Sequence, residues 1–158
     1  MQAEPRPALE DDATRHAAAQ HAGRRAQLVA ALRSAGNAPL GLARSTSNLF
    51  RDRAESPKHR LDLREFRHVL GIDVARGWVD VEGSTRYEDL VDATLSHGVM
   101  PAVVPQLRTI TVGGAAAGVG IEATSFRQGL VHDTLLEFDV LLPDGRIACA
   151  GHYGGDDP

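Results

Sequence analysis

The chain is poor in cysteine and lysine and has no long apolar run, and these absences narrow the class of protein to which it can belong. It contains one cysteine, Cys149, and one lysine, Lys58, among 158 residues. A single cysteine excludes an intramolecular disulfide and is typical of a protein that works in a reducing compartment. No apolar run approaches the ~18 residues of a membrane span, and the N-terminus carries no apolar core of a secretory signal. The sequence therefore predicts a cytoplasmic protein with no membrane span.

An excess of basic charge is also missing. The net charge is −4 at pH 7, whereas non-specific nucleic-acid binding normally needs a basic face. The chain shows neither a cluster of residues with metal-ligand spacing nor a G-x-S-x-G nucleophile elbow. We therefore expect no nucleic-acid partner and no metal site, and the catalytic residues stay unassigned.

The apolar pattern predicts an α+β fold in which helices and strands do not alternate regularly. One helix is expected over residues 13–35, ending at Gly36-Asn37. A second runs from Ser84 to Gly98, capped by Ser84 or Thr85, with Thr85 and Glu88 at capping-box spacing. Residues 1–38 are thus expected to form a tail and a helix, and residues 39–158 the domain.

Short extended segments account for most of the remaining chain. A strand is expected at residues 39–43, and residues 68–73 and 78–83 read as a hairpin. Residues 101–104 form another extended segment. A buried strand at 134–142 turns through Pro143-Asp144-Gly145 into a partner at 146–150.

The most informative stretch runs from Thr111 to Gly129 and gathers five glycines among Ala, Ser and Thr. These are Gly113, Gly114, Gly118, Gly120 and Gly129. Without a Cβ, backbone amides can approach a bulky anion, so the stretch indicates a phosphate-bearing cofactor. A set of turns in an Ala- and Gly-rich β-domain is the alternative.

A second candidate phosphate loop is Arg44-Ser45-Thr46-Ser47-Asn48, which follows the first expected strand. Hydroxyls and backbone donors in a short turn can wrap a pyrophosphate, with Arg44 supplying charge. Taken alone, the same composition is typical of a surface turn. Two such loops in one domain make the cofactor interpretation stronger for both.

Several other polar residues have ordinary explanations. His16 and His21 lie five apart on the first helix and are expected in solvent. Glu122 can accept a hydrogen bond from a ribose hydroxyl or from a backbone amide. His132 and Asp133 are adjacent in an extended segment, where neighbours point to opposite faces, so they are a weak acid/base pair. Cys149 is expected as a small core residue.

Residues Gly118 to Ala123 match the dinucleotide fingerprint G-x-G-x-x-A, and Asp139 lies nineteen residues after Gly120. A Rossmann site needs a helix that opens inside the motif and a parallel strand that ends at the acid. Residues 124–129 make a poor helix, and Asp139 falls inside its expected strand. NAD binding is therefore the third interpretation.

The residues 104–114, 118–125 and 129–130 closely resemble the FAD-binding domain of flavin-linked oxidoreductases. The superfamily is that of vanillyl-alcohol oxidase and p-cresol methylhydroxylase (PCMH). The pattern T-x-G-G, then G-x-G-I-E-x-x-S, then G is most similar to the branch with Δ24-sterol reductase. The helix from Tyr87 and the turn at Arg44–Asn48 also fit, so the likeness spans about residues 40–150.

The resemblance implies a PCMH-type domain in which FAD lies between two small α/β lobes. Its pyrophosphate would lie near Ser45–Asn48, beside Arg44, and near Thr111, Val112, Gly113 and Gly114. The residues implied around the adenine, ribose or flavin are Gly118, Gly120, Ile121, Glu122 and Ser125. No His or Cys matches a position of covalent attachment, so non-covalent FAD is expected to carry a hydride or electrons for an unidentified small-molecule substrate.

Family members continue into more of the FAD domain and then a substrate domain. Because this sequence stops at Pro158, the resemblance implies a domain incomplete at its C-terminus, as in a truncated product or a fragment. The first interpretation is an FAD-dependent oxidoreductase or its N-terminal flavin-binding portion. The alternative is a truncated, non-catalytic domain without a cofactor.

Overall fold

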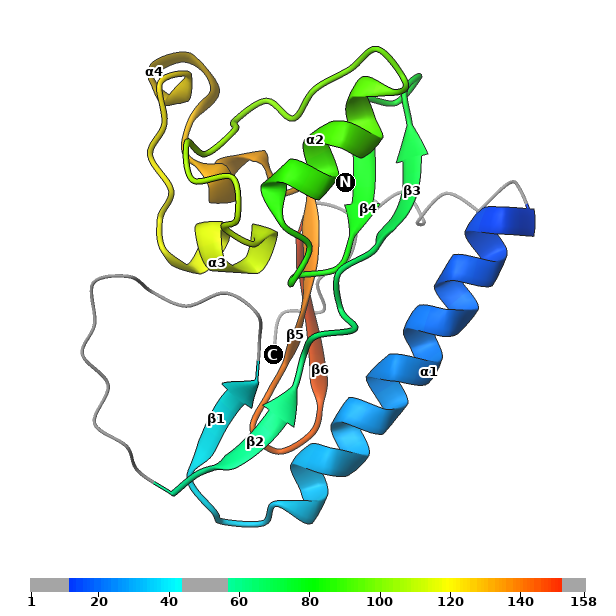
Figure 1. The fold of residues 1–158 in the computed structure, drawn as a ribbon, viewed down its shortest axis with the longest axis vertical. Coiled ribbons are helices and arrows are strands. Elements are labelled where there is room, and N and C mark those ends of the chain that lie inside the picture. Colours follow the sequence, from blue (N-terminus) through cyan, green and yellow to red (C-terminus); the bar gives the residue numbers. More distant parts are fainter. Residues whose placement is uncertain (1–11, 44–56, 152–158) are drawn as a thin grey trace.

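The computed structural model describes residues 12–43 and 57–151. Its elements in chain order are α1 (Asp12–Ser34), β1 (Leu40–Ala43), β2 (His59–Asp62), β3 (Val69–Asp73), β4 (Trp78–Val81), α2 (Tyr87–Leu95), α3 (Val112–Ala117), α4 (Ser125–Gln128), the 3-10 helix η1 (Val131–Thr134), β5 (Glu137–Leu141) and β6 (Ile147–Gly151). Figure 1 shows helices and small sheets without regular alternation, which confirms the α+β class.

Within residues 12–43 and 57–151, the strands form three two-stranded sheets. β3–β4 and β5–β6 are antiparallel hairpins, as the sequence predicts. Gly77 and Gly145 lie in their turns with φ of +72° and +83°, a conformation that glycine adopts without steric cost. The third sheet pairs β1 with β2 in parallel. β2 was missing from the sequence prediction because its four residues bury only Leu61 and show no apolar alternation.

Helix α1 is 23 residues long and lies against β2 and β3 (Figure 1). Its only buried residue is Leu32. The rest of its inner side combines half-buried apolar residues, such as Leu28 and Val29, with polar side chains that are described below. No helix among the described residues has the length and apolar character needed to cross a membrane.

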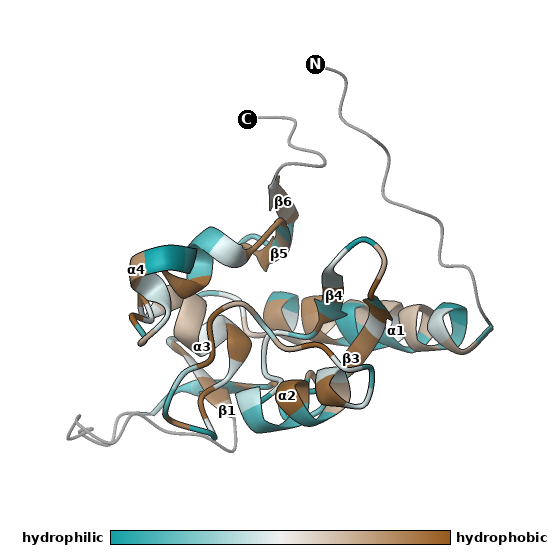
Figure 2. Cartoon of the chain, turned by 90° about the horizontal axis from the view of Figure 1, so that it is seen from above, coloured by the Kyte–Doolittle hydropathy of each residue, from teal (hydrophilic) through white to brown (hydrophobic). Residues whose placement is uncertain are grey.

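The hydrophobic core lies beneath α2 and α3. It consists of Tyr87, Leu90, Val103, Val112, Ala115 and Val131. Val112 and Ala115 come from the glycine-rich stretch, so burial of this stretch is part of the fold itself. Figure 2 shows both hydrophobic and hydrophilic residues on α2, with hydrophobic segments in the chain beside α3.

Three expectations about elements were wrong. Helix α2 begins at Tyr87 after Arg86, without a side-chain cap, because the Thr85 hydroxyl donates to the His68 carbonyl 3.2 Å away. Residues 101–104 form no strand, although Val103 is 1% exposed. The strand expected at 134–142 begins at Glu137 and is not buried, since Phe138 and Val140 are 46% and 40% exposed.

Candidate cofactor site

The glycine-rich stretch contains a short helix where the sequence suggested only a loop. Helix α3 starts after Thr111, whose Oγ1 accepts a hydrogen bond from the Gly114 amide at 3.1 Å. An N-terminal threonine cap and three consecutive alanines, Ala115–Ala117, favour the helix despite two glycines. The helix ends at Gly118, and α4 follows after an open segment at residues 119–124.

Residues 108–113 run antiparallel to residues 83–88. The Gly113 amide donates to the Gly83 carbonyl at 2.8 Å, and the Val112 amide to the Thr85 carbonyl at 2.9 Å. Further along, Arg86 and Thr111 form a β-bridge, and the Tyr87 amide donates to the Ile110 carbonyl at 2.9 Å. The start of α3 is therefore fixed to the segment between β4 and α2.

The glycines of this stretch allow the protein to pack against itself. A Cβ at Gly113 would lie 2.9 Å from the Gly83 carbonyl oxygen, and one at Gly118 would lie 2.9 Å from the Gly114 carbonyl oxygen. A Cβ at Gly120 would lie 2.9 Å from Val131 Cγ2. The amides of residues 112–114 donate to Thr85, Gly83 and Thr111. These backbone donors therefore form hydrogen bonds within the protein.

The open segment after α3 has a different character. Val119 has a φ of +53°, which is rare for a β-branched residue and typical of constrained functional loops. Val119 and Ile121 are 50% and 71% exposed. Within the described part of the chain, the Ile121 and Ala123 amides have no hydrogen-bond acceptor. This segment therefore combines free backbone donors with exposed apolar side chains.

Glu122 and Ser125 hold the open segment in place. The Glu122 carboxylate accepts the Gln106 amide at 3.2 Å, which confirms the backbone-amide alternative. The Ser125 hydroxyl oxygen accepts the Glu122 amide at 2.9 Å. Burial and, secondarily, the charge of Glu122 raise the pKa of the Tyr87 phenol beneath it.

A charged cluster with a buried carboxylate lies next to the Gly83–Gly113 contact, since Glu82 directly precedes Gly83. It consists of Glu82, His21, Arg24 and His68, and we call it the Glu82 cluster. The Glu82 side chain is fully buried, and its Oε1 accepts from His21 Nδ1 at 2.8 Å and from Arg24 Nη2 at 2.6 Å. Its Oε2 accepts from His68 Nδ1 at 2.7 Å and from the His68 amide at 3.0 Å.

The Glu82 cluster was missed in the sequence, and the expectation that His21 lies in solvent was wrong. His21 is 26% exposed because its ring faces Glu82, while His16 is exposed as expected and contacts Gln20. Burial alone would raise the pKa of Glu82, but hydrogen bonds from His21, Arg24 and His68 outweigh it and lower that pKa. The partners on α1 lie 58 or more residues before Glu82, and His68 lies 14 residues before it, so no local pattern reveals them.

The loop Arg44–Asn48 lies outside the described residues. In the sequence it directly follows β1. His132 and Asp133 are 3.6 Å apart and half-exposed, and Asp133 accepts the Leu130 amide at 2.8 Å, so this acid serves the local turn.

The expectation that Cys149 is a core residue was wrong, since it is exposed on β6. Its neighbours on β6, Ala148 and Ala150, are exposed as well. Cys149, Glu137 and Asp139 bring their ligand atoms within 4.8 Å of one another across the hairpin. Asp139 also pairs with Arg25 at 3.3 Å. Exposed acids gathered on a surface hairpin do not by themselves make a metal site, and we assign none.

The NAD interpretation does not fit the structure. Gly118 ends helix α3, whereas the dinucleotide fingerprint requires glycines that follow a strand and open a helix. Helix α4 has only four residues, and Asp139 lies in a strand paired antiparallel with β6.

Comparison with known proteins matches residues 16–151 to a family described as the FAD binding domain. Δ24-sterol reductase of Pisum sativum is 37% identical over 90 residues, which cover 57% of this chain and 16% of that protein. Cytokinin dehydrogenase 7 of Oryza sativa subsp. japonica is 37% identical over 101 residues, 61% of this chain and 19% of that protein. The matched segment thus spans less than a fifth of the length of these relatives.

Proposed function

Because the chain belongs to the family of FAD binding domains, we propose that it is the FAD-binding portion of an oxidoreductase. The observation that carries the proposal is the family match, which runs from α1 through β6 at residues 16–151. The names of the relatives, a sterol reductase and a cytokinin dehydrogenase, both describe redox enzymes. FAD supplies the hydride or electron transfer when bound, and the protein binds and orients it.

The open segment at residues 119–124 fits such a cofactor best. The free amides of Ile121 and Ala123 can donate to phosphate or ribose oxygens, and the exposed side chains of Val119 and Ile121 offer an apolar surface for a ring. We place non-covalent FAD here, with Gly118, Gly120, Glu122 and Ser125 shaping the backbone.

Two segments are assigned around the pyrophosphate. The first would bind it through charge and through hydroxyl and amide donors, and consists of Arg44, Ser45, Thr46, Ser47 and Asn48. The second consists of Thr111, Val112, Gly113 and Gly114. Because the amides of residues 112–114 already donate within the protein, this second segment contributes the position of α3 and of the open segment that follows it.

The wider assignments rest on composition. One cysteine suits a reducing compartment, and we propose a cytoplasmic location. The substrate is a small molecule, and no residue of this chain is assigned to its chemistry.

The experiment is an FAD titration of the purified chain, followed by flavin absorbance in the near-UV and blue. We expect yellow protein whose FAD is released by acid. Ile121→Asp places a charge on the proposed ring surface and should weaken FAD binding about tenfold or more, the effect of ~1.4 kcal/mol. Its melting temperature should stay unchanged because Ile121 is 71% exposed.

Leu95→Asp is the matched control, since Leu95 is 51% exposed on α2 and lies outside the proposed site. It should leave both FAD affinity and melting temperature unchanged. A colourless, folded chain that takes up no added FAD would contradict the proposal and favour a domain without a cofactor. Equal losses of FAD affinity in Ile121→Asp and Leu95→Asp would mean that FAD does not bind at the open segment.

A further inference from the structure

We propose that Glu82 is a positioning residue for the cofactor segment. Through the peptide that follows it, Glu82 fixes the Gly83 carbonyl, which in turn holds the Gly113 amide and the start of α3. The inference rests on the proposed function, because the proposed FAD site gives the placement of α3 its consequence.

The first step is the fixed orientation of the Glu82 carboxylate. Both of its oxygens are used: Oε1 by His21 and by Arg24, whose Nε and Nη2 lie 3.0 and 2.6 Å away, and Oε2 by the ring and amide of His68. The donors come from α1 and from the residue before β3. A fully buried carboxylate held from two elements has one low-energy placement, since any rotation would leave a buried charge unpaired.

The second step is the backbone on either side of this carboxylate. The Glu82 amide donates to the His68 carbonyl at 2.9 Å, and the Thr85 amide donates back to the Glu82 carbonyl at 3.0 Å. Gly83 lies inside this turn and has no atom within 4 Å of the position of a Cβ. Its placement therefore depends on the bonds of its neighbours.

The third step is the tight contact between Gly83 and the cofactor segment. The Gly113 amide donates to the Gly83 carbonyl at 2.8 Å, and even a Cβ on Gly113 would come within 2.9 Å of that oxygen. Because the two backbones are closely packed and joined by a hydrogen bond, a displacement of Gly83 must displace Gly113 as well. Gly113 lies in the first turn of α3, which leads into the open segment at residues 119–124.

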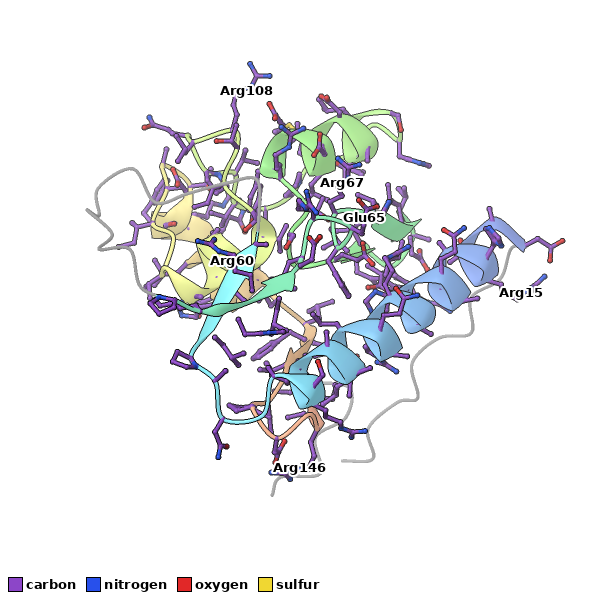
Figure 3. The ribbon with its side chains drawn as sticks, turned by 60° about the horizontal axis from the view of Figure 1, so that its bottom comes forward. Arg15, Arg60, Glu65, Arg67, Arg108 and Arg146 are labelled. Atoms are coloured by element: carbon purple, nitrogen blue, oxygen red, sulfur yellow. The ribbon has the colours of Figure 1, made fainter. Side chains whose placement is uncertain are left out.

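The Glu82 cluster differs from the other charges of the molecule. Arg15, Arg108 and Arg146 project outward in Figure 3, and Arg60 is exposed as well. Arg108 is 81% exposed and pairs with Glu88. Arg24, by contrast, is 18% exposed, and it turns inward to a carboxylate that solvent does not reach.

The test compares E82Q with D62N in the full chain. Asp62 pairs with Arg64 at 2.6 Å on the surface, so D62N removes a carboxylate from an ion pair that has no link to Gly83. For each variant we would measure FAD affinity and, by NMR hydrogen exchange, the protection of the Gly113 amide, with the amides of β5 and β6 as internal reference. All measurements are made where circular dichroism shows a folded chain.

We expect E82Q to weaken FAD binding about tenfold and to speed exchange at Gly113 about tenfold more than at β5 and β6, where only the general loss of stability acts. D62N should leave both unchanged. A merely structural role would speed exchange everywhere in parallel. If E82Q does not fold, R24Q, which keeps the His21 and His68 contacts, takes its place with the same expected direction.

Two failures can be told apart. Wild-type protein that binds no FAD overturns the proposed function, and the cofactor consequence of Glu82 falls with it. Wild-type protein that binds FAD, combined with a folded E82Q whose Gly113 exchange and FAD affinity are unchanged, overturns the positioning role alone.

Discussion

At the scale of single residues, glycine has two different uses in this chain. At Gly36, Gly77 and Gly145 the φ angle is between +56° and +83°, so glycine is needed for the backbone conformation. At Gly113 the angle is ordinary, and glycine is needed for space against Gly83. A glycine-rich stretch therefore need not mark the atoms that touch a ligand. It can mark the packing that places them.

Gly113→Ala tests the second use. The added methyl group would lie 2.9 Å from the Gly83 carbonyl oxygen, a backbone atom that cannot swing away. We expect the variant to lose about 1–3 kcal/mol in free energy of unfolding, measured by urea denaturation. The gain in helix propensity, up to ~1 kcal/mol, offsets only part of this.

Gly83→Ala is the matched control, since nothing lies within 4 Å of its added methyl group. Gly83 supplies the carbonyl of the same contact from the turn after β4, and the variant should change the free energy of unfolding by less than ~0.5 kcal/mol. Similar losses in both variants would mean that the two backbones do not touch as described.

At the scale of elements, α1 buries little apolar surface completely and is also held by ion pairs. Leu32 is its one buried residue, while Arg24 and His21 reach Glu82 and Arg25 reaches Asp139. Gly23 lies inside this helix with nothing within 4 Å of a Cβ. Gly23→Ala should therefore raise the free energy of unfolding by ~0.5–1 kcal/mol, seen as a higher melting temperature.

Gly36→Ala is the counterpart just after the same helix. Space is also open there, but φ is +56°, so alanine would be strained. We expect it to lower the melting temperature. If both variants changed stability in the same direction, backbone conformation would not explain the difference between the two positions.

The elements that could be predicted are those whose signal is local. The long helix, both hairpins and helix α2 follow from apolar spacing and turn residues, and the structure has all of them. β2 could not be predicted from the sequence, because a short parallel strand is defined by its partner and not by an alternation of apolar residues of its own. Helix α3 could not be predicted either, because its two glycines disfavour a helix and outweigh the signals of the Thr111 cap and of the buried Val112 and Ala115.

The candidate site divides in the same way. The stretch Thr111–Gly129 could be singled out from its composition and its resemblance to FAD-binding domains. The left-handed backbone at Val119 could not, because valine disfavours that conformation and the surrounding contacts impose it. The Glu82 cluster could not either, since His21 and Arg24 meet Glu82 only when α1 folds back on the β3–β4 hairpin.

At the scale of the whole molecule, apolar surface remains open on the strands. Leu42 on β1 and Phe138 on β5 are 47% and 46% exposed, and Phe126 on α4 is 91% exposed. The core beneath α2 and α3 is small, and the fully buried Glu82 carboxylate links α1 to the segment after β4 through His21 and Arg24. Stability should therefore depend on pH through Glu82.

The sign of this dependence follows from the lowered pKa of Glu82. Its pKa in the folded chain lies below the usual 4.5, because His21, Arg24 and His68 stabilise the carboxylate against the effect of burial. Such a group contributes stability above its unfolded pKa, and that stability is lost as the pH falls through the folded pKa. Comparing wild type with E82Q isolates this contribution from those of other acids.

We expect wild type to exceed E82Q by about 3 kcal/mol in free energy of unfolding near neutral pH, the scale for a broken buried pair. The difference should hold down to about pH 5.5 and shrink progressively below about pH 4.5. Urea denaturation across this range measures it. His16→Gln, which alters an exposed histidine of α1 outside the cluster, should follow the wild-type curve. A difference that stays constant into acid would mean that folding does not change the pKa of Glu82, and one that grows as the pH falls would mean that the folded chain disfavours its charge.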